Sequence, residues 1–306
     1  MAIPTSRGNA ITTAGIDEKS CTGCELCVTA CPEKNIFIKD KKAAFQLNPY
    51  FGCIGCGHCM AICPKGAIAI HGRDIDASNV FPLSYTTNAA TYAQLLSLMQ
   101  KRRSTRLFKD TPVSKDSINK IIKAAQTAPM GIPPSEVNII VWESKESVLT
   151  FTKDFCSLLE QMNWMVSDWF LFIMKIFLSK TNYLFFKDFV KPLVNIYVDN
   201  MKHGINYVTY DAPATIYFYG SPYCDYADPI IAATYAMLAA ESLGLGTCMI
   251  GGIHPFLQNG SKAKAFREKY GITYKSKTGL FVIFGYPKIK FKKGIKRSFA
   301  SVTTIP

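Results

Sequence analysis

Hydrophobic residues recur at helical spacing in two parts of the chain and predict a helix in each, and terminal residues indicate a third. Residues 92–100 (YAQLLSLMQ) place apolar side chains three and four positions apart. Ser114 is a good N-cap for a second helix, whose apolar face comprises Ile118, Ile121, Ile122 and Ala125. A third, longer helix follows Asp228, which we expect to be its N-cap, with Pro229 at the first helical position and Gly244 at the C-terminal end.

Short apolar runs rich in β-branched and aromatic residues predict strands. Two such runs, residues 35–39 (NIFIK) and 67–71 (AIAIH), lie in the first quarter of the chain. Three more lie further on, at residues 137–142, 214–219 and 280–284. Because helices and strands are mixed without the strict alternation of a parallel sheet, we expect an α+β fold.

The composition divides the chain into two domains. Its 306 residues suit one large or two ordinary domains of roughly 150 residues each, and 48% hydrophobic with 19% charged residues is typical of a globular protein. Cysteines become sparse after Arg73, and residues 74–91, rich in Asp, Ser, Asn and Thr, are typical of a linker. We therefore expect one domain over residues 1–80 and a second over residues 92–306, with an aromatic-rich helical insertion at about residues 150–200.

The apolar runs predict a cytoplasmic protein without a membrane partner. Residues 1–15 lack the apolar core of a secretory signal. The most apolar stretch, residues 169–178 (WFLFIMKIFL), has ten residues and contains Lys175, whereas a membrane-spanning helix needs roughly 20. Cysteines in such a compartment are better interpreted as metal ligands or free thiols than as disulfides.

Eight of the eleven cysteines fall into two runs with the same spacing. Both follow C-x2-C-x2-C-x3-C-P, the pattern of bacterial ferredoxins that hold two [4Fe-4S] clusters. In that motif the fourth cysteine of each run binds the other cluster, which ties the two halves of a small domain together. The ligands of the first cluster would be Cys21, Cys24, Cys27 and Cys63, and those of the second Cys53, Cys56, Cys59 and Cys31.

Other interpretations of the cysteines account for less of the pattern. Zinc needs one set of four ligands per site and gives no reason for two identical runs with trailing prolines. A disulfide framework does not fit the expected compartment. His58 lies inside the second run but is not assigned as a ligand beside a full set of cysteines. Cys156, Cys224 and Cys248 stand alone, where we expect packing rather than chemistry.

The second domain resembles the FMN-dependent nitroreductase family in four segments that occur in the same order. The first is R-R-S-x-R at residues 102–106, just after the first helix, and the second is the loop APMGIPP at residues 128–134. The third is AAESLGLGTCMIGG at residues 239–252, and the fourth is a basic segment at residues 292–297. The resemblance spans roughly residues 92–300 and implies an α+β domain that binds FMN.

The same resemblance implies which residues contact FMN. The phosphate is a dianion that suits guanidinium and hydroxyl donors, and the matching residues are Arg102, Arg103, Ser104 and Arg106, joined by Lys296 and Arg297. The register among Lys292, Lys293, Lys296 and Arg297 stays open. Small residues let the backbone approach the flavin ring. One face of the ring would meet Met249, Ile250, Gly251 and Gly252, and the other Pro129, Met130 and Gly131.

This chain departs from many relatives at the flavin. They have Ser and Asn after the proline of the loop and an acidic residue at the place of Gly251. The departures concern the substrate side of the ring.

The basic excess of the chain has an alternative explanation. Lys and Arg number 35 against 22 Asp and Glu, a formal charge of +13, which is also typical of nucleic-acid binding. Few aromatic residues alternate with the basic ones, as single-strand binding would require. Residues 1–80 carry 8 basic and 7 acidic side chains and the remainder 27 and 15, so the excess belongs to the second domain. We expect phosphate binding and no nucleic acid partner.

Residues 150–200 hold a dense set of Phe, Trp, Tyr and Met side chains with two interpretations. One is a helical lid that lines an apolar substrate pocket. The other, which helical spacing favours, is a dimer interface or core. Members of the family are homodimers with the flavin at the subunit interface, so one segment could serve both roles.

The combination of the two domains predicts an oxidoreductase. Clusters carry single electrons, whereas a flavin can accept electrons singly and pass on two. We expect electrons to pass from a low-potential donor, which could be a ferredoxin, a flavodoxin or NAD(P)H, through the two clusters to FMN. The acceptor would be a nitroaromatic, quinone or activated alkene. The alternatives are a dehydrogenase that runs electrons from substrate to the clusters, and an electron-transfer subunit without catalysis. No catalytic side chain is nominated.

Overall fold

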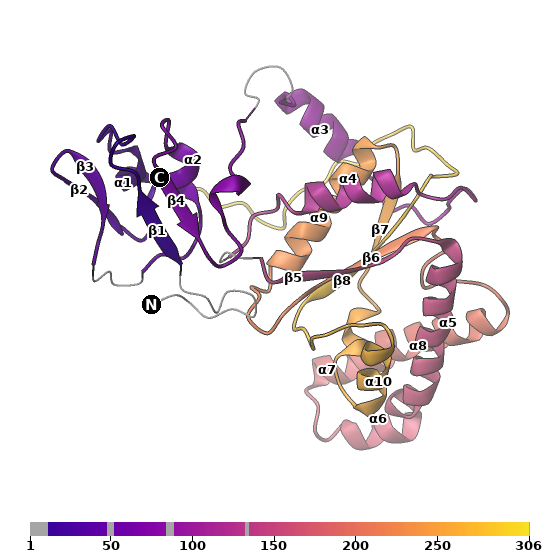
Figure 1. Ribbon diagram of the computed structural model, residues 1–306. Coiled ribbons are helices and arrows are strands. Elements are labelled where there is room, and N and C mark those ends of the chain that lie inside the picture. Colours follow the sequence, from indigo (N-terminus) through magenta and orange to yellow (C-terminus); the bar gives the residue numbers. More distant parts are fainter. Residues whose placement is uncertain (1–11, 48–51, 84–88, 132–134, 306) are drawn as a thin grey trace.

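The computed structural model describes residues 12–305 except 48–51, 84–88 and 132–134 (Figure 1). Its fold is α+β, as expected, with a small first domain and a larger second one. The elements of the first domain are β1 (Thr13–Ile16), α1 (Leu26–Ala30), β2 (Ile36–Lys39), β3 (Lys42–Phe45), α2 (His58–Ile62) and β4 (Ile68–His71).

The first domain contains two antiparallel strand pairs, β1 with β4 and β2 with β3. The strands expected at residues 35–39 and 67–71 are confirmed as β2 and β4. Its core is small and consists of aliphatic side chains together with cysteines. A core of this size contributes little free energy of folding, so a bound metal group would stabilise the domain.

The internal repeat is visible in the backbone of α1 and α2. Each of these five-residue helices follows a residue in the left-handed conformation, Glu25 with φ 64° and Gly57 with φ 73°. Each ends at the fourth cysteine of its run, with φ −75° and ψ 112° at Cys31 and φ −73° and ψ 111° at Cys63. The two runs therefore follow almost the same path.

The second domain begins with α3 (Tyr92–Lys101), which confirms the first predicted helix. Thr91 accepts a hydrogen bond from the backbone N–H of Gln94, and the Gln94 side chain accepts one from the backbone N–H of Thr91. This reciprocal capping box fixes where α3 begins. Before it, η1 (Ala77–Asn79) is a single turn capped by Asp76.

A four-stranded antiparallel sheet forms the centre of the second domain, in the order β5-β6-β8-β7. Its strands confirm the three expected from the sequence, at β5 (Val137–Trp142), β6 (Ala214–Gly220) and β8 (Gly279–Gly285), and add the edge strand β7 (Gly246–Ile250). Successive side chains of a strand point to opposite faces. Tyr217 and Phe281 accordingly face one core, whereas Ile216 and Val282 face the other.

The face with Ile216 is covered by α4 (Lys115–Ala125) and α9 (Asp228–Ser242). Ser114 caps α4 as expected, since its hydroxyl accepts from the backbone N–H of Ser117. Gly244, with φ 77°, follows the end of α9, also as expected. The expectation that Asp228 caps α9 is wrong, because Ala227 is the N-cap and Asp228 is already helical.

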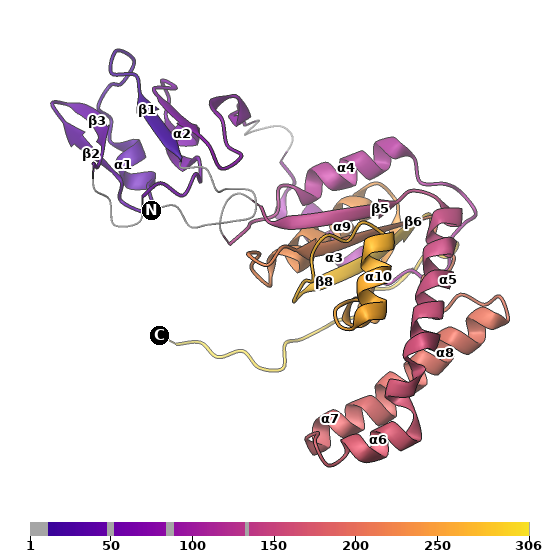
Figure 2. The ribbon, with the colours of Figure 1, turned by 60° about the horizontal axis from the view of Figure 1, so that its bottom comes forward.

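The opposite face is covered by α5 (Lys145–Met162), α8 (Lys191–Lys202) and α10 (Ser261–Lys269). Between α5 and α8 the chain forms η2 (Asn163–Val166), α6 (Asp168–Met174), α7 (Lys180–Phe185) and η3 (Phe186–Val190). We call residues 163–190 the aromatic hairpin. It projects from the ends of α5 and α8 in both ribbon views (Figure 2). Among the described residues, no helix combines the length and apolar character that crossing a membrane requires.

Candidate functional site

The eight cysteines of the two runs surround two separate cavities in the first domain. Cys21, Cys24, Cys27 and Cys63 line one of them. Cys31, Cys53, Cys56 and Cys59 line the other. Each cavity thus takes three cysteines from one run and the fourth from the other, which is the grouping that the motif predicts. We call these the first and the second cavity.

Glycines allow each run to turn around its cavity. Gly23 has φ 68° and Gly55 has φ 71°, a region that L side chains rarely adopt. A Cβ atom at Gly23 would also overlap the carbonyl oxygen of Lys41. Backbone N–H groups point at the sulfurs: those of Asn35 and Ala67 donate to Cys31 and Cys63, each at 3.3 Å.

The second cavity disfavours four free thiolates. Burial, together with the neighbouring Cys53 and Cys56, raises the pKa of Cys59 to about 12. Burial also raises the pKa of Cys53. In the first cavity the backbone N–H groups of Ala43 and Gly23 lower the pKa of Cys21. Iron would supply the positive charge that a set of four thiolates needs, so thiolate donors around each cavity fit an iron–sulfur cluster.

In the second domain, residues 102–106 lie along the free edge of β7. Ser104 and Thr247 form a parallel bridge, and the backbone N–H of Thr105 donates to the Thr247 carbonyl oxygen at 2.9 Å. Gly246 permits this approach, because a Cβ atom there would overlap the Thr105 side chain. The segment therefore extends the sheet and runs in the same direction as β7.

Arg103 carries an unpartnered donor at the start of β7. Its Nη2 is buried and has no hydrogen-bond partner within the described residues. It lies 3.9 Å from the position that a Cβ of Gly294 would occupy. A cavity of about 530 Å³ adjoins this point, and its lining includes Lys101, Lys292, Lys293 and Lys296. A buried guanidinium nitrogen without a partner, beside a group of lysines, is suited to an anion such as phosphate.

The structure separates Arg106 from this anion-binding region. The Arg106 guanidinium carbon lies 5.7 Å from the centre of the Tyr210 ring. The hydroxyl oxygen of Tyr197 lies 3.1 Å from the position that a Cβ of Gly252 would occupy. Burial raises the pKa of Tyr197 to about 12, although the positive charge of Arg106 acts to lower it. Arg106 thus belongs to the Gly252 end of β7. Sequence analysis missed Tyr197 and Tyr210, because no motif marks them.

The other predicted FMN residues lie in several places. Arg102 ends α3, whereas Arg297 is exposed and does not line the lysine-rich cavity. Met249 is exposed on β7 beside the buried Ile250. Residues 132–134 of the predicted loop lie outside the described residues.

The loop with Pro129 and Met130 lies at the opposite edge of the sheet. Both residues line a cavity of about 180 Å³ together with residues of β5 and α9. The sheet order places β5 and β7 at its two edges, three strand spacings or roughly 14 Å apart. One chain therefore does not bring Pro129, Met130 and Gly131 to the segment 249–252.

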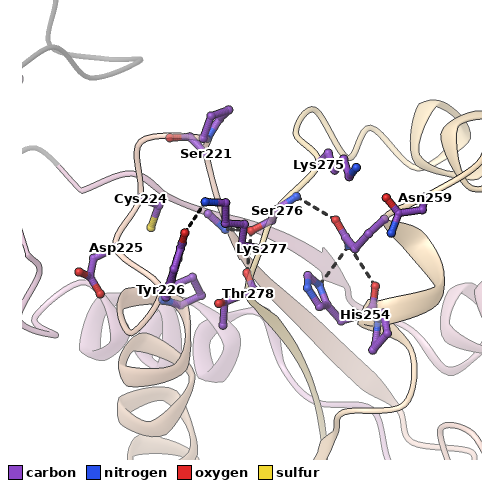
Figure 3. A pocket seen from close by; sticks show the side chains of 15 residues that line it. Ser221, Cys224, Asp225, Tyr226, His254, Asn259, Lys275, Ser276, Lys277 and Thr278 are labelled. Carbon is purple, nitrogen blue, oxygen red and sulfur yellow. Dashed lines mark hydrogen bonds between the residues drawn. The ribbon is translucent and has the colours of Figure 1, made fainter. Parts of the chain in front are cut away.

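The largest of the described cavities, about 670 Å³, lies elsewhere, between the end of β6 and the start of β8 (Figure 3). Inside it, the Nδ1 atom of His254 lies 2.8 Å from the Tyr217 hydroxyl and 3.2 Å from Nε2 of Gln258. Burial lowers the pKa of His254, which keeps the ring neutral. Lys277 donates to the Tyr226 hydroxyl. The polar groups of this cavity thus bond mainly to one another, and the sequence pattern did not mark them.

The remaining cysteines are buried or half-buried. Burial raises the pKa of Cys156 and of Cys224 to about 12, so both are protonated thiols at neutral pH. Cys248 is buried in the sheet. Cys156 and Cys248 pack in the core, as expected, whereas Cys224 is half-buried and lines the 670 Å³ cavity.

Fold and site together define a two-domain protein, in which a cysteine-lined module precedes an α+β domain with a basic cavity near the edge strand β7. Residues 99–286 match the family model described as the nitroreductase family, and residues 13–71 match the 4Fe-4S dicluster domain. The chain belongs to the nitroreductase family and carries an N-terminal 4Fe-4S dicluster domain. A comparison with curated proteins gives no match.

Among solved structures, the chain is similar to a nitroreductase with bound FMN from Bacteroides fragilis NCTC 9343, with 18% identity and a TM-score of 0.49 over 70% of this chain and 99% of the other. A nitroreductase with bound FMN from Desulfitobacterium hafniense DCB-2 has 20% identity and a TM-score of 0.49, over 69% and 98%. An FMN-dependent nitroreductase from Clostridium difficile R20291 has 22% identity and a TM-score of 0.41, over 68% and 99%.

Proposed function

We propose that the chain is an iron–sulfur flavoprotein oxidoreductase. Electrons from a low-potential donor would pass through two [4Fe-4S] clusters to FMN and on to an organic acceptor such as a nitroaromatic, quinone or activated alkene. The observation that carries the proposal is the joining, in one chain, of a 4Fe-4S dicluster domain to a nitroreductase domain. Similar solved structures described as having bound FMN support the choice of flavin.

The two cavities would each hold one cluster. The ligands would be Cys21, Cys24, Cys27 and Cys63 in the first cavity, and Cys31, Cys53, Cys56 and Cys59 in the second. Bound clusters supply one-electron transfer. The protein contributes the sulfur ligands and the N–H groups of Asn35 and Ala67, which stabilise negative charge on two of them.

FMN would lie along β7. Arg103, Ser104 and the lysines of the 530 Å³ cavity, Lys296 among them, would bind its phosphate, with Arg102 and Arg297 as further cations. Four residues of strand, about 13 Å at 3.3 Å per residue, separate Thr247 from Gly251. That span leaves room for the sugar-alcohol chain between phosphate and ring. The ring would then lie near Met249, Gly252 and Arg106.

A second copy of the chain would complete the site. The loop with Pro129, Met130 and Gly131 lies at the sheet edge opposite β7, so it can reach a flavin more readily in a partner than in its own chain. The aromatic hairpin offers contact area for such a partner. Large apolar side chains there that are more than half exposed are Trp164, Trp169, Phe172, Ile176, Phe177, Phe185 and Phe189.

That exposure is unusually large for a monomer. If each of these seven side chains presents about 200 Å² and two thirds of it is exposed, the hairpin exposes on the order of 900 Å². A typical monomer has a largest apolar patch of about 300–600 Å², and each side of a standard interface buries about 800 Å². These values support a homodimer. Its donor and acceptor would be drawn from the cytoplasm, the compartment that the sequence predicts.

Cofactor content tests the proposal directly. Protein purified without oxygen should contain about eight irons and a matching amount of sulfide, as two four-iron clusters require, with one FMN per chain. Protein without flavin after reconstitution would overturn the enzyme function and leave an electron-transfer subunit. Mixing cluster-reduced protein with a nitroaromatic should accelerate its reoxidation. If only a reduced substrate changed the spectrum, electrons would run in the opposite direction, towards the clusters.

A further inference from the structure

The two cavities have nearly the same backbone, so any difference between their clusters has to come from side chains and burial. The fourth cysteines, Cys31 and Cys63, agree within 2° in φ and 1° in ψ. Each accepts one N–H hydrogen bond from the residue four positions on, at the same distance of 3.3 Å. The backbone dipoles near these sulfurs are therefore matched.

Arg73 breaks this symmetry at the second cavity. It is only 2% exposed and is among the largest fully buried side chains of the protein. Its Cβ and Cδ atoms lie 3.5 and 3.6 Å from the position that a Cβ of Gly55 would occupy, between the ligands Cys53 and Cys56. Burial raises the pKa of Cys53, and the positive charge of Arg73 acts against that rise.

The backbone at Arg73 is in an unfavourable conformation for this residue. Gly72 and Ile75 exchange both backbone hydrogen bonds, each at 3.2 Å, around a turn in which Arg73 has φ 54° and Asp74 has φ 65°. Turns with two positive φ values strongly prefer Asn and Gly. The fold holds Arg73 there against its local preference.

The equivalent residue of the first repeat is Lys41, which precedes Arg73 by the same number of positions as Cys21 precedes Cys53. Lys41 also has a positive φ, 61°, and its backbone lies over Gly23 as Arg73 lies over Gly55. Its side chain, however, is exposed. Solvent screens an exposed ammonium, whereas the interior screens a buried guanidinium far less.

The first cavity has a cation of its own, Lys42, but it is less deeply buried than Arg73. Lys42 is half-buried and donates to the carbonyl oxygen of Cys21 at the first cavity. The lining of the first cavity includes Glu25 and Lys65, and that of the second includes Glu33. Of these, Glu25 and Lys65 are exposed and Glu33 is half-buried.

We propose that Arg73 raises the reduction potential of the cluster in the second cavity relative to the cluster in the first, and so determines where a single electron resides in the module. The inference rests on the proposed [4Fe-4S] clusters. A cluster with four thiolates gains one negative charge when it accepts one electron, and no proton moves. A buried positive charge stabilises the more negative, reduced state. The electron leaves the first cluster and reduces the second.

The test compares the midpoint potentials of the two clusters in four proteins. Dithionite titrations with mediators, followed by electron paramagnetic resonance, would be run anaerobically on the wild type, Arg73→Met, Arg73→Lys and Lys41→Met. We expect Arg73→Met to lower one midpoint by about 59 mV or more, which is a tenfold change in the one-electron equilibrium between the clusters. Arg73→Lys keeps the positive charge, so it should retain most of the separation between the two midpoint potentials. Lys41→Met should leave both midpoints unchanged.

Two results would overturn the inference. One is that Arg73→Met leaves the separation of the two midpoints unchanged, and the other is that Lys41→Met shifts it as much. If Arg73→Met loses iron, Arg73→Gln provides a second neutral variant. Loss of iron from both, with iron retained in Arg73→Lys, would assign Arg73 to folding instead. A wild type without four-iron clusters would refute the proposed function itself, which its iron content reveals before any variant is measured.

Discussion

The backbone N–H of Gly131 donates a hydrogen bond to the carboxylate of Asp228, 3.1 Å from one oxygen and 3.3 Å from the other. The contact joins the loop before β5 to the first turn of α9. Asp228 is buried, and burial raises its pKa. A single buried carboxylate therefore holds in place the loop that we propose to face the flavin of a partner.

Two substitutions at Asp228 separate the hydrogen bond from the charge. Asp228→Asn keeps an acceptor for Gly131 and removes the buried charge, so its free energy of unfolding at pH 7 should equal or exceed that of the wild type. Asp228→Ala leaves the Gly131 N–H without its acceptor and should cost about 1–3 kcal/mol. Urea unfolding followed by tryptophan fluorescence measures both.

The pH dependence of the same pair has a definite sign. Because folding raises the pKa of Asp228 above its ordinary value of about 3.9, the contribution of Asp228 to wild-type stability falls as pH rises through that value to the raised pKa. The advantage of Asp228→Asn should therefore grow from acid towards neutral pH. An advantage that is the same at pH 7 as at a pH below about 3.9 would show that the buried charge is not its cause.

Cysteine variants test the crossed ligation through iron content. The double variant Cys31→Ser/Cys53→Ser removes two ligands of the same proposed cluster and should retain about four irons per chain, like each single variant. The matched double variant Cys31→Ser/Cys21→Ser removes one ligand of each cluster and should retain few. Equal iron contents in the two double variants would contradict the grouping.

Arg103 and Arg106 should affect different properties of the flavin. Arg103→Ala removes the unpartnered donor from the anion-binding region, a loss of about 1.5–3 kcal/mol that weakens FMN binding about ten- to a hundredfold. Arg106→Ala removes a cation beside Tyr210 and should lower the flavin potential, because reduced flavin is the more negative form. Fluorescence titration and spectroelectrochemistry measure the two effects.

Lys262→Ala is the control for both arginine variants. Lys262 is exposed on α10, so its loss should change neither FMN affinity nor potential. Iron content should stay constant in all three variants. Unchanged FMN affinity in Arg103→Ala would refute the phosphate site.

The aromatic hairpin should control the oligomeric state. Trp169→Ser/Phe172→Ser replaces two side chains that are 73% and 74% exposed, so it should shift a dimer towards monomer with little change in the stability of the chain. Sedimentation velocity over a range of concentrations measures the shift. Phe81→Ser, at a side chain 71% exposed within the linker, is the matched control. If the double variant dimerises as the wild type does, the aromatic hairpin is not the dimer interface and would contact another partner instead.

Local patterns in the sequence were enough to predict most elements of the sheet and its helices. The capping box at Thr91, the cap at Ser114 and the left-handed Gly244 all depend on neighbours within a few positions. Asp228 was misassigned because an Asp-Pro pair suits both an N-cap and the first helical position. In the structure the Asp228 carboxylate accepts a hydrogen bond from Gly131, 97 residues away, a contact that no local pattern contains.

The cysteine grouping could be predicted for a different reason. The repeated motif itself specifies which distant cysteines share a cluster, because its fourth cysteine binds the cluster of the other run. The segments of the flavin region contain no repeat that specifies their long-range contacts. Arg103 and Arg106 are three residues apart, yet the bridge between Ser104 and Thr247 places them at opposite ends of a strand. Tyr197 reaches the same place from α8, so only the tertiary structure reveals it.

Glu25 adopts, with φ 64°, the conformation that Gly57 adopts in the second run. For a residue with a side chain this conformation costs roughly 1–2 kcal/mol. A small core cannot readily absorb that cost, whereas the binding energy of a metal group can. Folding of the first domain should therefore follow the supply of iron in the cell. Under iron starvation, newly made chains would carry a folded second domain joined to an unfolded first one, which is the form that proteases would remove.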